Sequence, residues 1–576
     1  MSTLVAQNAV DENTASWTSD LRRGVGAGLG GALIAVYLGA VGLLLMMNDR
    51  PVVAGMATLA QVALGGIALM AGMLAQRRAR HGAQPALWTS VLAGLVAALV
   101  VLAFANLIVA VNLRSIFIAL TPPLARLISF GQVKSLGGSG LFVVASVLLA
   151  LAGGLLHRAP RGFRRLVVPA VTTVLVAGVF QDFIQVILQS NPVFRSVAPW
   201  FYGWDGLLPR GGLTIFAIAL VLAAVPRVAR GKAAAPRTGV ARFAPALVLL
   251  VGLILVPLAG GPYVAQVFLL VGLYVLMGMG LNLELGLAGL LDLGFVAFFA
   301  TGAYVTALLT ADSPLALASY TMIPSLSFWA AMPLAVLAAV GVGILFGVPV
   351  LGVRGDYLAV ATLGLGEIVR IVVLSDAAAP VLGGAQGILQ IPKPTLFGFE
   401  FSGPVSLFYL TLVAAGFAAY CAWRLECSRL GRAWIALRED EDVAQAMGIN
   451  LVQCKLLAYA FGAAFAGLAG SIFAVMVNSV FPSSFQLLMS INVLALIVVG
   501  GLGSLPGVAL GALVLIGLPE ALREFGEFRY LFYGLALILT MRLMPDGLWP
   551  ARRSRRAPSV LVAPEGEGAA VGAGQS

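Results

Sequence analysis

Residues 456–519 read LLAYAFGAAFAGLAGSIFAVMVNSVFPSSFQLLMSINVLALIVVGGLGSLPGVALGALVLIGLP and contain no Asp, Glu, Lys or Arg. A helix that crosses the hydrocarbon core of a bilayer needs about 20 predominantly apolar residues. The stretch is therefore long enough for about three crossings, and it predicts an α-helical membrane region. Small residues recur in it at Gly462, Ala466 and Gly470, a spacing that favours close packing between helices in lipid.

The rest of the chain has the same character. Of its 576 residues, 60% are hydrophobic and 10% are charged, whereas soluble domains carry about 25% charged residues. The net charge of +11 comes mainly from short basic clusters between apolar runs. That pattern is typical of cytoplasmic loops in membrane proteins. Because no basic domain lies outside the apolar runs, a nucleic-acid partner is not expected.

Together, the apolar runs and the basic loops predict an all-α polytopic membrane protein with about sixteen membrane segments, give or take two. The shorter pieces near the end are either crossings or re-entrant segments. The expected segments lie near 25–47, 52–75, 86–111, 139–156, 166–188, 211–226, 243–260, 263–283, 285–310, 328–352, 356–375, 403–423, 456–479, 488–500, 505–519 and 530–545.

Composition also predicts the domain organisation. A polar cytoplasmic tail (1–24) precedes an N-terminal membrane region (25–226) with about six spans and no assignable role. A basic, Ala/Pro/Gly-containing stretch (227–242) is expected to be a cytoplasmic linker to a second membrane region (243–550). The segment 551–576 is basic and then Gly/Ala/Glu-rich, which predicts a disordered cytoplasmic tail. Both termini are therefore expected on the cytoplasmic side.

No residue pattern in the chain predicts catalysis or a cofactor. The only Gly-Lys pair, Gly231-Lys232, is followed by Ala and lacks the glycine-rich phosphate cradle of an ATPase. The three cysteines have no CxxC spacing, so neither a disulfide framework nor a metal site is expected. We therefore expect a non-enzymatic chain with no catalytic, cofactor-binding or metal-ligating residues.

Charged residues inside apolar runs are costly in lipid and therefore informative. Glu284 and Asp292 flank a glycine-rich turn, Glu367 and Arg370 lie three residues apart on one helical face, and Asp182 lies in the N-terminal region. Each of these sites has two interpretations. Its charged residues either take part in transport or form a structural pair whose members compensate each other's charge.

The longest polar segment between two membrane spans is CSRLGRAWIALREDEDVAQAMGINLVQCK, residues 427–455. Its composition suits a helix that lies along the membrane surface. The mixed charges of residues 438–442 suit a docking surface for a soluble partner, although such runs are also common in solvated loops.

At this segment the chain resembles the permeases of branched-chain amino acid ABC importers, of the LivM type. Gly431-Arg432-Ala433 and the run ALREDE (436–441) carry the resemblance in the loop. Further blocks agree in the same order over about 245–550, and the first 240 residues match nothing in the family. These blocks are GLAGLLDLGFVAFFATGAY (286–304), TLGLGEIVRI (362–371), IPKPTLFGFEF (391–401), IVVGGLGS (497–504) and LPEALREF (518–525).

The resemblance implies an importer of leucine, isoleucine and valine in the inner membrane. Its expected partners are two cytoplasmic ATPases that use ATP, a second permease subunit and a periplasmic binding protein. The loop 427–455 would hold the coupling helix that contacts an ATPase, although Asp442-Val443-Ala444 is a degenerate form of the usual motif. The expected coupling residues are Gly431, Arg432, Arg438, Glu439, Asp440, Glu441, Asp442, Ala444 and Gly448.

A path for neutral aliphatic substrates is expected along small residues and broken helices. Its candidate residues, which could also be structural polar sites, are Gly286, Gly289, Asp292, Gly302, Gly364, Gly366, Glu367 and Arg370. Two alternatives are a secondary transporter driven by an ion gradient through its intramembrane carboxylates and an ABC permease for urea or short amides. In a third, the N-terminal region is a scaffold or regulatory domain fused to the permease.

Overall fold

A computed structural model shows the fold of this chain. It describes residues 2–77, 86–111, 117, 119–128, 136–190, 192–203, 206–224, 244–310, 325–353 and 355–551. The expected linker (227–242), Arg354 and the expected tail from residue 552 onward lie outside the described residues.

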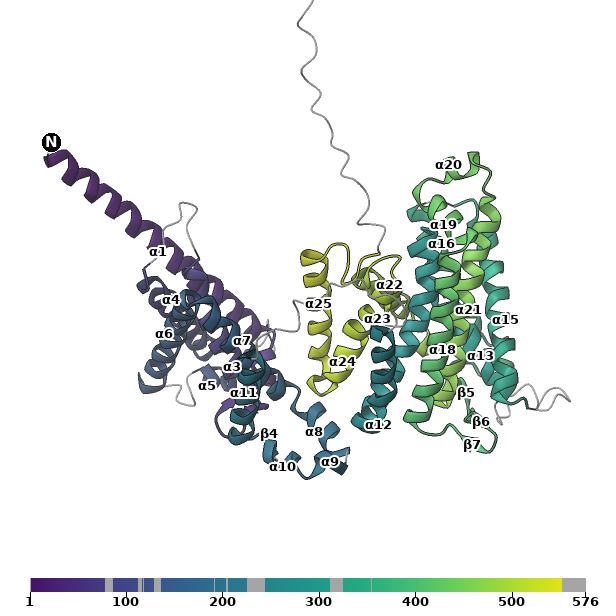
Figure 1. The fold of residues 1–576 in the computed structure, drawn as a ribbon, viewed down its shortest axis with the longest axis horizontal. Helices are drawn as coiled ribbons and strands as arrows, with labels where there is room; N and C mark the ends of the chain where they lie inside the picture. The colour runs from purple at the N-terminus through teal and green to yellow at the C-terminus, as the bar shows by residue number, and fades with distance from the viewer. Residues whose placement is uncertain are drawn as a thin grey trace, which may run out of the picture. The chain divides into compact units, whose positions relative to one another are not determined.

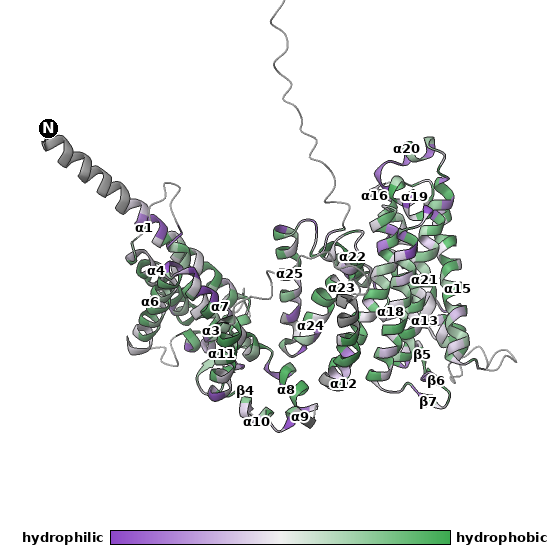
Figure 2. Ribbon diagram, viewed as in Figure 1, coloured by the Kyte–Doolittle hydropathy of each residue, from purple (hydrophilic) through white to green (hydrophobic). Residues whose placement is uncertain are grey.

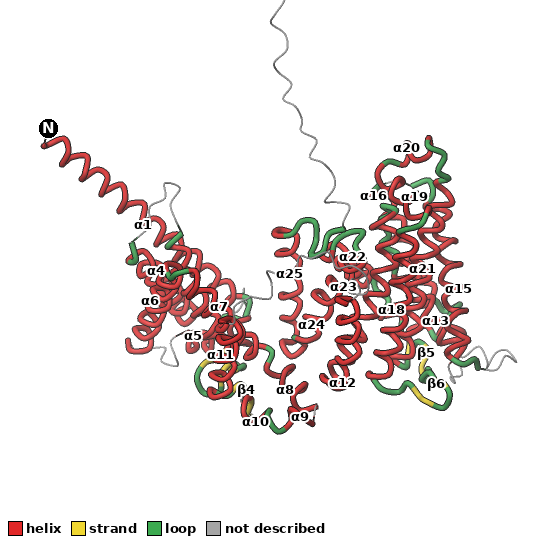
Figure 3. The backbone as a smooth tube through the Cα atoms, viewed as in Figure 1, coloured by secondary structure: helices red, strands yellow, loops and turns green. Residues whose placement is uncertain are grey.

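The chain forms two compact units, residues 1–261 and 262–576. Both are built from α-helices, with a few two-residue and three-residue strands in short hairpins and ladders (Figures 1 and 3). Figure 2 shows apolar residues over most of the length of the long helices. The described part therefore has the all-α architecture expected of a polytopic membrane protein.

Unit 1 contains a bundle of four long helices followed by shorter elements. Its elements are α1 (Ser2–Ala40), α2 (Leu43–Asn48), β1 (Pro51–Val53), β2 (Ala57–Thr58), α3 (Leu59–Ala75), α4 (Trp88–Ala110), α5 (Pro122–Ile128), α6 (Leu136–Arg158), α7 (Arg161–Val179), α8 (Gln181–Ser190), α9 (Pro192–Arg195), α10 (Ala198–Phe201), β3 (Tyr202–Gly203), β4 (Gly206–Leu207) and α11 (Pro209–Ala224).

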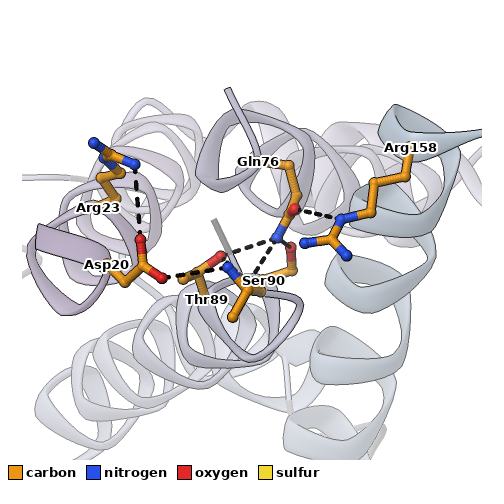
Figure 4. Close-up of polar contacts among 7 residues, drawn as sticks. Asp20, Arg23, Gln76, Thr89, Ser90 and Arg158 are labelled. Carbon is orange, nitrogen blue, oxygen red and sulfur yellow. Dashed lines mark hydrogen bonds and ion pairs between the residues drawn. The ribbon is translucent and has the colours of Figure 1, made fainter. Parts of the chain in front are cut away.

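A polar network ties one end of this bundle together (Figure 4). The side-chain amide of Gln76, just after α3, donates to Thr89 Oγ1 at 2.9 Å and to Ser90 Oγ at 3.0 Å. Its carbonyl oxygen accepts a 2.9 Å hydrogen bond from Arg158 Nε on α6. Gln76 is buried, so these partners offset the cost of removing an amide from water. The network connects α3, α4 and α6.

Two expectations for unit 1 differ from the structure. Residues 2–24 of the predicted tail form the first part of the continuous helix α1. The segment expected near 166–188 is two helices, because the chain leaves helical geometry at Phe180 between α7 and α8. Beyond this break Asp182 forms an ion pair with Arg50, 3.3 Å apart, that no hydropathy pattern could predict.

Helix α12 (Ala244–Leu281) has a kink at Gly261, and the part after the kink belongs to unit 2. Its remaining elements are η4 (Asn282–Leu287), α13 (Val296–Thr310), α15 (Phe328–Val350), α16 (Asp356–Leu374), α17 (Ala379–Leu382), η5 (Gly384–Gln386), β5 (Ile388–Leu389), β6 (Thr395–Leu396), β7 (Phe399–Glu400), α18 (Pro404–Glu426), α19 (Arg429–Glu439), α20 (Glu441–Ala446), α21 (Leu451–Val477), β8 (Ser479–Val480), η6 (Pro482–Ser484), α22 (Leu487–Gly500), α23 (Leu505–Ala512), η7 (Leu513–Gly517), α24 (Leu518–Ala521), η8 (Arg523–Phe528) and α25 (Arg529–Leu543); α12 itself runs over Ala244–Leu281.

Helix α21 is the centre of unit 2, and its small residues allow close packing. Gly470 lies against the backbone of α13 at Phe299, and Gly302 of α13 lies against the backbone of Gly467. A side chain at either glycine would overlap that backbone, so the expected packing stripe is present. Gly302, a candidate path residue, is thus a contact between helices.

The membrane segment expected near 285–310 is not one continuous helix. The chain forms a π-helical turn, η4, then runs without helix from Ala288 to Phe295, and only then begins α13. Gly289 lies in this break with φ of +75°, a left-handed conformation that residues with a side chain rarely adopt. The physical reason is local, because the glycines of the block 286–294 release the backbone from helical geometry. The block therefore marks a broken helix.

The two ends of helix α18 distinguish the two faces of unit 2. It follows the β6–β7 hairpin at one end and leads into α19 and α20 at the other (Figure 1). The hairpin is anchored by Trp329 Nε1, which donates to Thr395 O at 2.8 Å, and by Lys393 Nζ, which donates to Val475 O at 2.6 Å. Partial burial lowers the pKa of Lys393, and nearby Glu400 opposes this shift.

Among the described residues, ten helices are long and apolar enough to cross a membrane. Four shorter apolar helices, among them α3 and α13, accompany them. Large apolar side chains such as Leu337 and Leu345 on α15 and Val413 on α18 face outward. That arrangement suits lipid, where apolar surface needs no burial within the protein. The total of about sixteen segments stays a prediction.

Candidate functional site

The predicted surface helix in 427–455 is present as two short helices joined at Asp440. Ser428 begins α19, because its hydroxyl accepts a hydrogen bond from Gly431 N at 3.2 Å. Asp440 begins α20 by accepting from the backbone N–H groups of Asp442 and Val443 at 2.9 and 3.0 Å. Such caps satisfy donors that a helix start leaves unpaired. We name residues 428–448 the coupling loop.

Two buried side chains hold the coupling loop on α21. The indole of Trp434, fully buried, donates from Nε1 to Cys454 O at 2.8 Å. Lys455, also buried, forms an ion pair with Glu441 of α20 at 2.9 Å. A buried ammonium needs such a partner, so Glu441 has a structural role whatever else it contacts. The loop is therefore a rigid part of unit 2.

Apolar and charged side chains share the outer surface of the coupling loop. Val443 on α20 is 58% exposed and Met447, which ends this helix four residues later, is 79% exposed, while Ala444 between them is buried. Arg432, Glu439, Asp440 and Asp442 are also exposed, and Gly431 is buried. An exposed Val and Met on a protruding helix, rimmed by charges, are typical of a protein-binding surface.

Arg438 connects the coupling loop to the broken helix. Its guanidinium Nη1 donates to the carbonyl oxygen of Gly286 at 2.6 Å, and its aliphatic stem lies beside Gly289. The break also contacts a second turn, because Asn282 Oδ1 in η4 accepts from Gly503 N at 2.9 Å. The predicted loop residue Arg438 and the predicted path residues Gly286 and Gly289 thus form one contact chain, which ends at the turn between α22 and α23.

A large open hollow lies beside this contact chain. Its volume is about 820 Å³, and its lining includes Gly286, Arg438, Gly503, Trp423 and Trp549. It lies at the end of unit 2 that carries the coupling loop. Glycines expected in a substrate path, Gly286 and Gly289, therefore lie close to the loop expected to receive the ATPase.

Two buried carboxyl groups lie inside unit 2 near the break. Glu284 and Asp292 are at most 1% exposed and lie close enough to interact electrostatically. Asp292 Oδ1 accepts from Gly294 N at 2.7 Å, but both oxygens of Glu284 have no hydrogen-bond partner among the described residues. The hydroxyl of Tyr459 on α21 likewise has no hydrogen-bond partner among the described residues. Burial away from water penalises the charged form of each carboxyl group, and two like charges in one site repel each other.

The other expected polar pair lies on α16. Arg370 Nε donates to Glu367 Oε1 at 2.8 Å, and both side chains stay partly exposed. Arg370 and Gly366 line a small cavity of about 10 Å³ between α16 and α13. Gly364 has open space where a side chain would be.

The structure thus separates the sequence-predicted path residues into four places. Gly286 and Gly289 lie at the coupling loop, Asp292 lies in the buried carboxyl pair, and Gly302 packs against α21. The remaining residues lie on α16, namely Gly364, Gly366, Glu367 and Arg370. Sequence reasoning missed the residues that give these places their chemistry, namely Asn282, Tyr304, Trp434, Tyr459 and Phe485. Asn282 lies just before the quoted block 286–304 and Tyr304 is its last residue, but nothing in the linear order indicated their partners.

Comparison with known proteins agrees with this architecture. The pattern of the family described as "Branched-chain amino acid transport system / permease component" matches residues 263–541. The high-affinity branched-chain amino acid transport system permease protein LivM of Salmonella typhimurium is 41% identical over 304 residues, covering 49% of this chain and 68% of the relative.

Two other relatives extend the comparison. A LivM transport permease of Methanocaldococcus jannaschii is 23% identical over 331 residues, covering 50% of this chain and 94% of its own length. The permease protein LivH of Salmonella typhimurium is 29% identical over 178 residues, covering 30% of this chain and 55% of its own. No solved structure matches.

The family pattern, the identity to LivM and the apolar helices agree on one class of protein. The matched residues 263–541 lie within unit 2, which carries the coupling loop, the broken helix and the ion pair on α16. This chain is a multi-pass membrane protein and belongs to the branched-chain amino acid transport permease family.

Proposed function

We propose that this chain is the permease subunit of an ATP-binding-cassette importer that moves leucine, isoleucine and valine across the cytoplasmic membrane. The observation that carries the proposal is the coupling loop, a rigid projection with exposed Val443 and Met447. Its Arg438 reaches the carbonyl oxygen of Gly286 in a broken membrane helix. A displacement of the loop would be transmitted to that break through packed, hydrogen-bonded groups.

The chain then acts with partners and performs no chemistry itself. Two cytoplasmic ATPase subunits would hydrolyse ATP, and a periplasmic protein would deliver the amino acid. A second permease subunit would complete the membrane part, since Salmonella typhimurium has both LivM and LivH relatives of this chain. In this arrangement the coupling loop and both termini are cytoplasmic, and the β6–β7 hairpin faces the periplasm.

The test is co-purification of an ATPase with this chain from mild detergent. Changing Glu439, Asp440, Glu441 and Asp442 together would be ambiguous, because Asp440 caps α20 and Glu441 pairs with Lys455. The substitutions V443S and M447S remove exposed apolar surface and leave those contacts intact. We expect the native chain to recover an ATPase and the double variant to lose it. If the native chain recovers none while a control ABC complex stays intact, the proposal fails.

One observation favours a second candidate, a transporter driven by an ion gradient. Asp182 and Glu367 each have a basic partner, whereas Glu284 and Asp292 have no cationic partner among the described residues. A buried carboxyl pair of this kind can hold and release a proton. Uptake into vesicles that contain ATP but no ion gradient separates the two candidates. Uptake that requires the gradient and not ATP would favour the second.

A further inference from the structure

The ion pair on α16 lies where a lipid-facing helix should carry none. The apolar span Tyr357–Leu374 has ten residues before Glu367 and seven after it, so Glu367 lies near the middle. Glu367 is 41% exposed and Arg370 33% exposed. Charged groups in a membrane span are costly unless they face protein or a water-filled cavity. Their surface is therefore not a lipid surface.

Arg370 also borders a cavity with a second polar group that lacks a partner. Tyr304 of α13 is only 5% exposed and lines the same cavity. Its hydroxyl has no hydrogen-bond partner among the residues that the structure describes. A buried hydroxyl left unpaired costs free energy, so it is expected to meet a ligand or water. With a volume of about 10 Å³, the cavity has room for about one water molecule.

The remaining walls of the cavity are apolar. Ala300 and Val369 contribute aliphatic surface, and Phe485 packs against the Tyr304 ring with centroids 5.7 Å apart. Phe485 follows η6, which comes after the end of α21 that lies far from the coupling loop. The cavity therefore lies toward the face opposite the coupling loop, where a substrate of an importer would enter.

We propose that Glu367, Arg370 and Tyr304 form a binding site for a zwitterionic aliphatic amino acid on its way through the permease. Arg370 binds the α-carboxylate, with the Tyr304 hydroxyl as a second donor, and Glu367 binds the α-ammonium group. The aliphatic side chain contacts Ala300, Val369 and Phe485. The ion pair closes the empty site and opens when α16 moves away from α13. This proposal rests on the proposed function, since it names the substrate contacts of that transport.

Charge complementarity favours this occupant over a single ion. A zwitterionic amino acid carries a carboxylate and an ammonium group close together. It can therefore replace the Glu367–Arg370 ion pair and leave neither side chain without an opposite charge. A cation would satisfy Glu367 alone and would leave Arg370 unpaired. A second permease subunit that covers this face with its own charges is the competing occupant.

The test uses the complete transporter, with its ATPases, partner permease and binding protein, in membrane vesicles with radiolabelled leucine. The variants are E367Q, R370Q, Y304F and the charge swap E367R/R370E. The matched control is E520Q/R523Q, which removes another pair of Glu and Arg three residues apart. ATPase co-purification is measured for every variant.

We expect E367Q and R370Q each to lower the maximal uptake rate about tenfold or more, as the loss of a charge-assisted hydrogen bond implies. Y304F should lower it less. The charge swap E367R/R370E should not restore uptake, because the Tyr304 hydroxyl fixes which end of the site binds the α-carboxylate of the amino acid. Near-native uptake by E367R/R370E, with an ATPase still bound, would show that the ion pair is only structural and would overturn the proposal. Native uptake rates in E367Q and R370Q would overturn it as well. A native complex that moves no leucine with ATP would instead refute the proposed function.

Discussion

The guanidinium of Arg438 in α19 and the carbonyl oxygen of Gly286, 152 residues earlier in the chain, are joined by a 2.6 Å hydrogen bond. The donor belongs to the coupling loop, and the acceptor belongs to the π-helical turn where a membrane helix breaks. A hydrogen bond from a charged donor to a carbonyl oxygen is stronger than one between two neutral groups.

We predict that R438A uncouples transport from ATP hydrolysis. The substitution removes the link to Gly286 but leaves Trp434 and Lys455 to hold the loop on α21. The ATPase should therefore still bind and hydrolyse ATP, while leucine moved per ATP falls by about tenfold, the effect of losing one charge-assisted bond. The measurement is uptake and phosphate release in the same vesicles. R542A, an exposed arginine in the last turn of α25, is the control, and an unchanged ratio in R438A would contradict the prediction.

Gly462 and Glu284 are expected to be energetically coupled. A side chain at Gly462 would overlap the Glu284 carboxyl group, so G462A should lower the stability by about 1–3 kcal/mol through overpacking. E284A removes a carboxyl group that has no hydrogen-bond partner in the part of the chain that the structure describes, and it frees that space. The free energy of unfolding of G462A/E284A should therefore exceed the value expected from adding the two single effects, by about 0.5–3 kcal/mol. Unfolding of the purified chain in detergent measures this, and simple additivity would refute the coupling.

The native cysteines provide a test of sidedness. Cys427, just before the coupling loop, is exposed, whereas Cys454 is buried. A membrane-impermeant maleimide should therefore label Cys427 in inverted vesicles and not in right-side-out vesicles, with C427S as the control. Labelling from the periplasmic side would reverse the orientation proposed for the loop.

Lys393 is expected to stabilise the β6–β7 hairpin. K393M would leave the carbonyl oxygens of Val475 and Met476 without this donor, which costs about 1–3 kcal/mol. Amide hydrogen exchange in residues 388–400 should accelerate in K393M and recover partly in K393R. Equal exchange rates in K393M and the native chain would show that the anchor is not needed.

The same lysine predicts a pH effect of defined sign. Burial lowers the pKa of Lys393 in the folded chain, so on raising the pH the folded state loses this proton before the unfolded state does. Between the folded-state and unfolded-state pKa values of Lys393, the unfolded state binds more protons than the folded state. The contribution of Lys393 to the free energy of unfolding therefore rises with pH over that interval. K393M should lack this rise when unfolding is measured across the interval. A rise of equal size in K393M would assign it to another group.

The N-terminal unit is predicted to be dispensable for transport. The M. jannaschii relative aligns over 94% of its own length to half of this chain, and unit 1 forms its own compact fold. Deleting residues 1–240 should leave ATP-driven leucine uptake within about twofold of the native rate, a change below 1 kcal/mol. Loss of uptake with intact membrane insertion would make unit 1 part of the transport machinery.

Several features of this protein were determined by its sequence alone. Runs of about 20 apolar residues can be stable only as helices in lipid, so the polytopic all-α class follows from run length and charge. The charged surface loop and the glycine-rich block were also visible, because both depend on local composition. The family blocks, in one order, indicated a permease before any fold was known.

Only the tertiary structure decided how the polar groups are used. Glu284, Asp292 and Glu367 look alike in the sequence, as carboxyl groups inside apolar runs. In the structure Glu367 has Arg370 beside it, whereas Glu284 and Asp292 lie close together with no cationic partner among the described residues. The hydrogen bond from Arg438 to Gly286 was likewise not predictable from the sequence. The physical reason is that hydropathy acts through neighbours in the chain, whereas the satisfaction of a buried polar group depends on partners that folding brings from more than a hundred residues away.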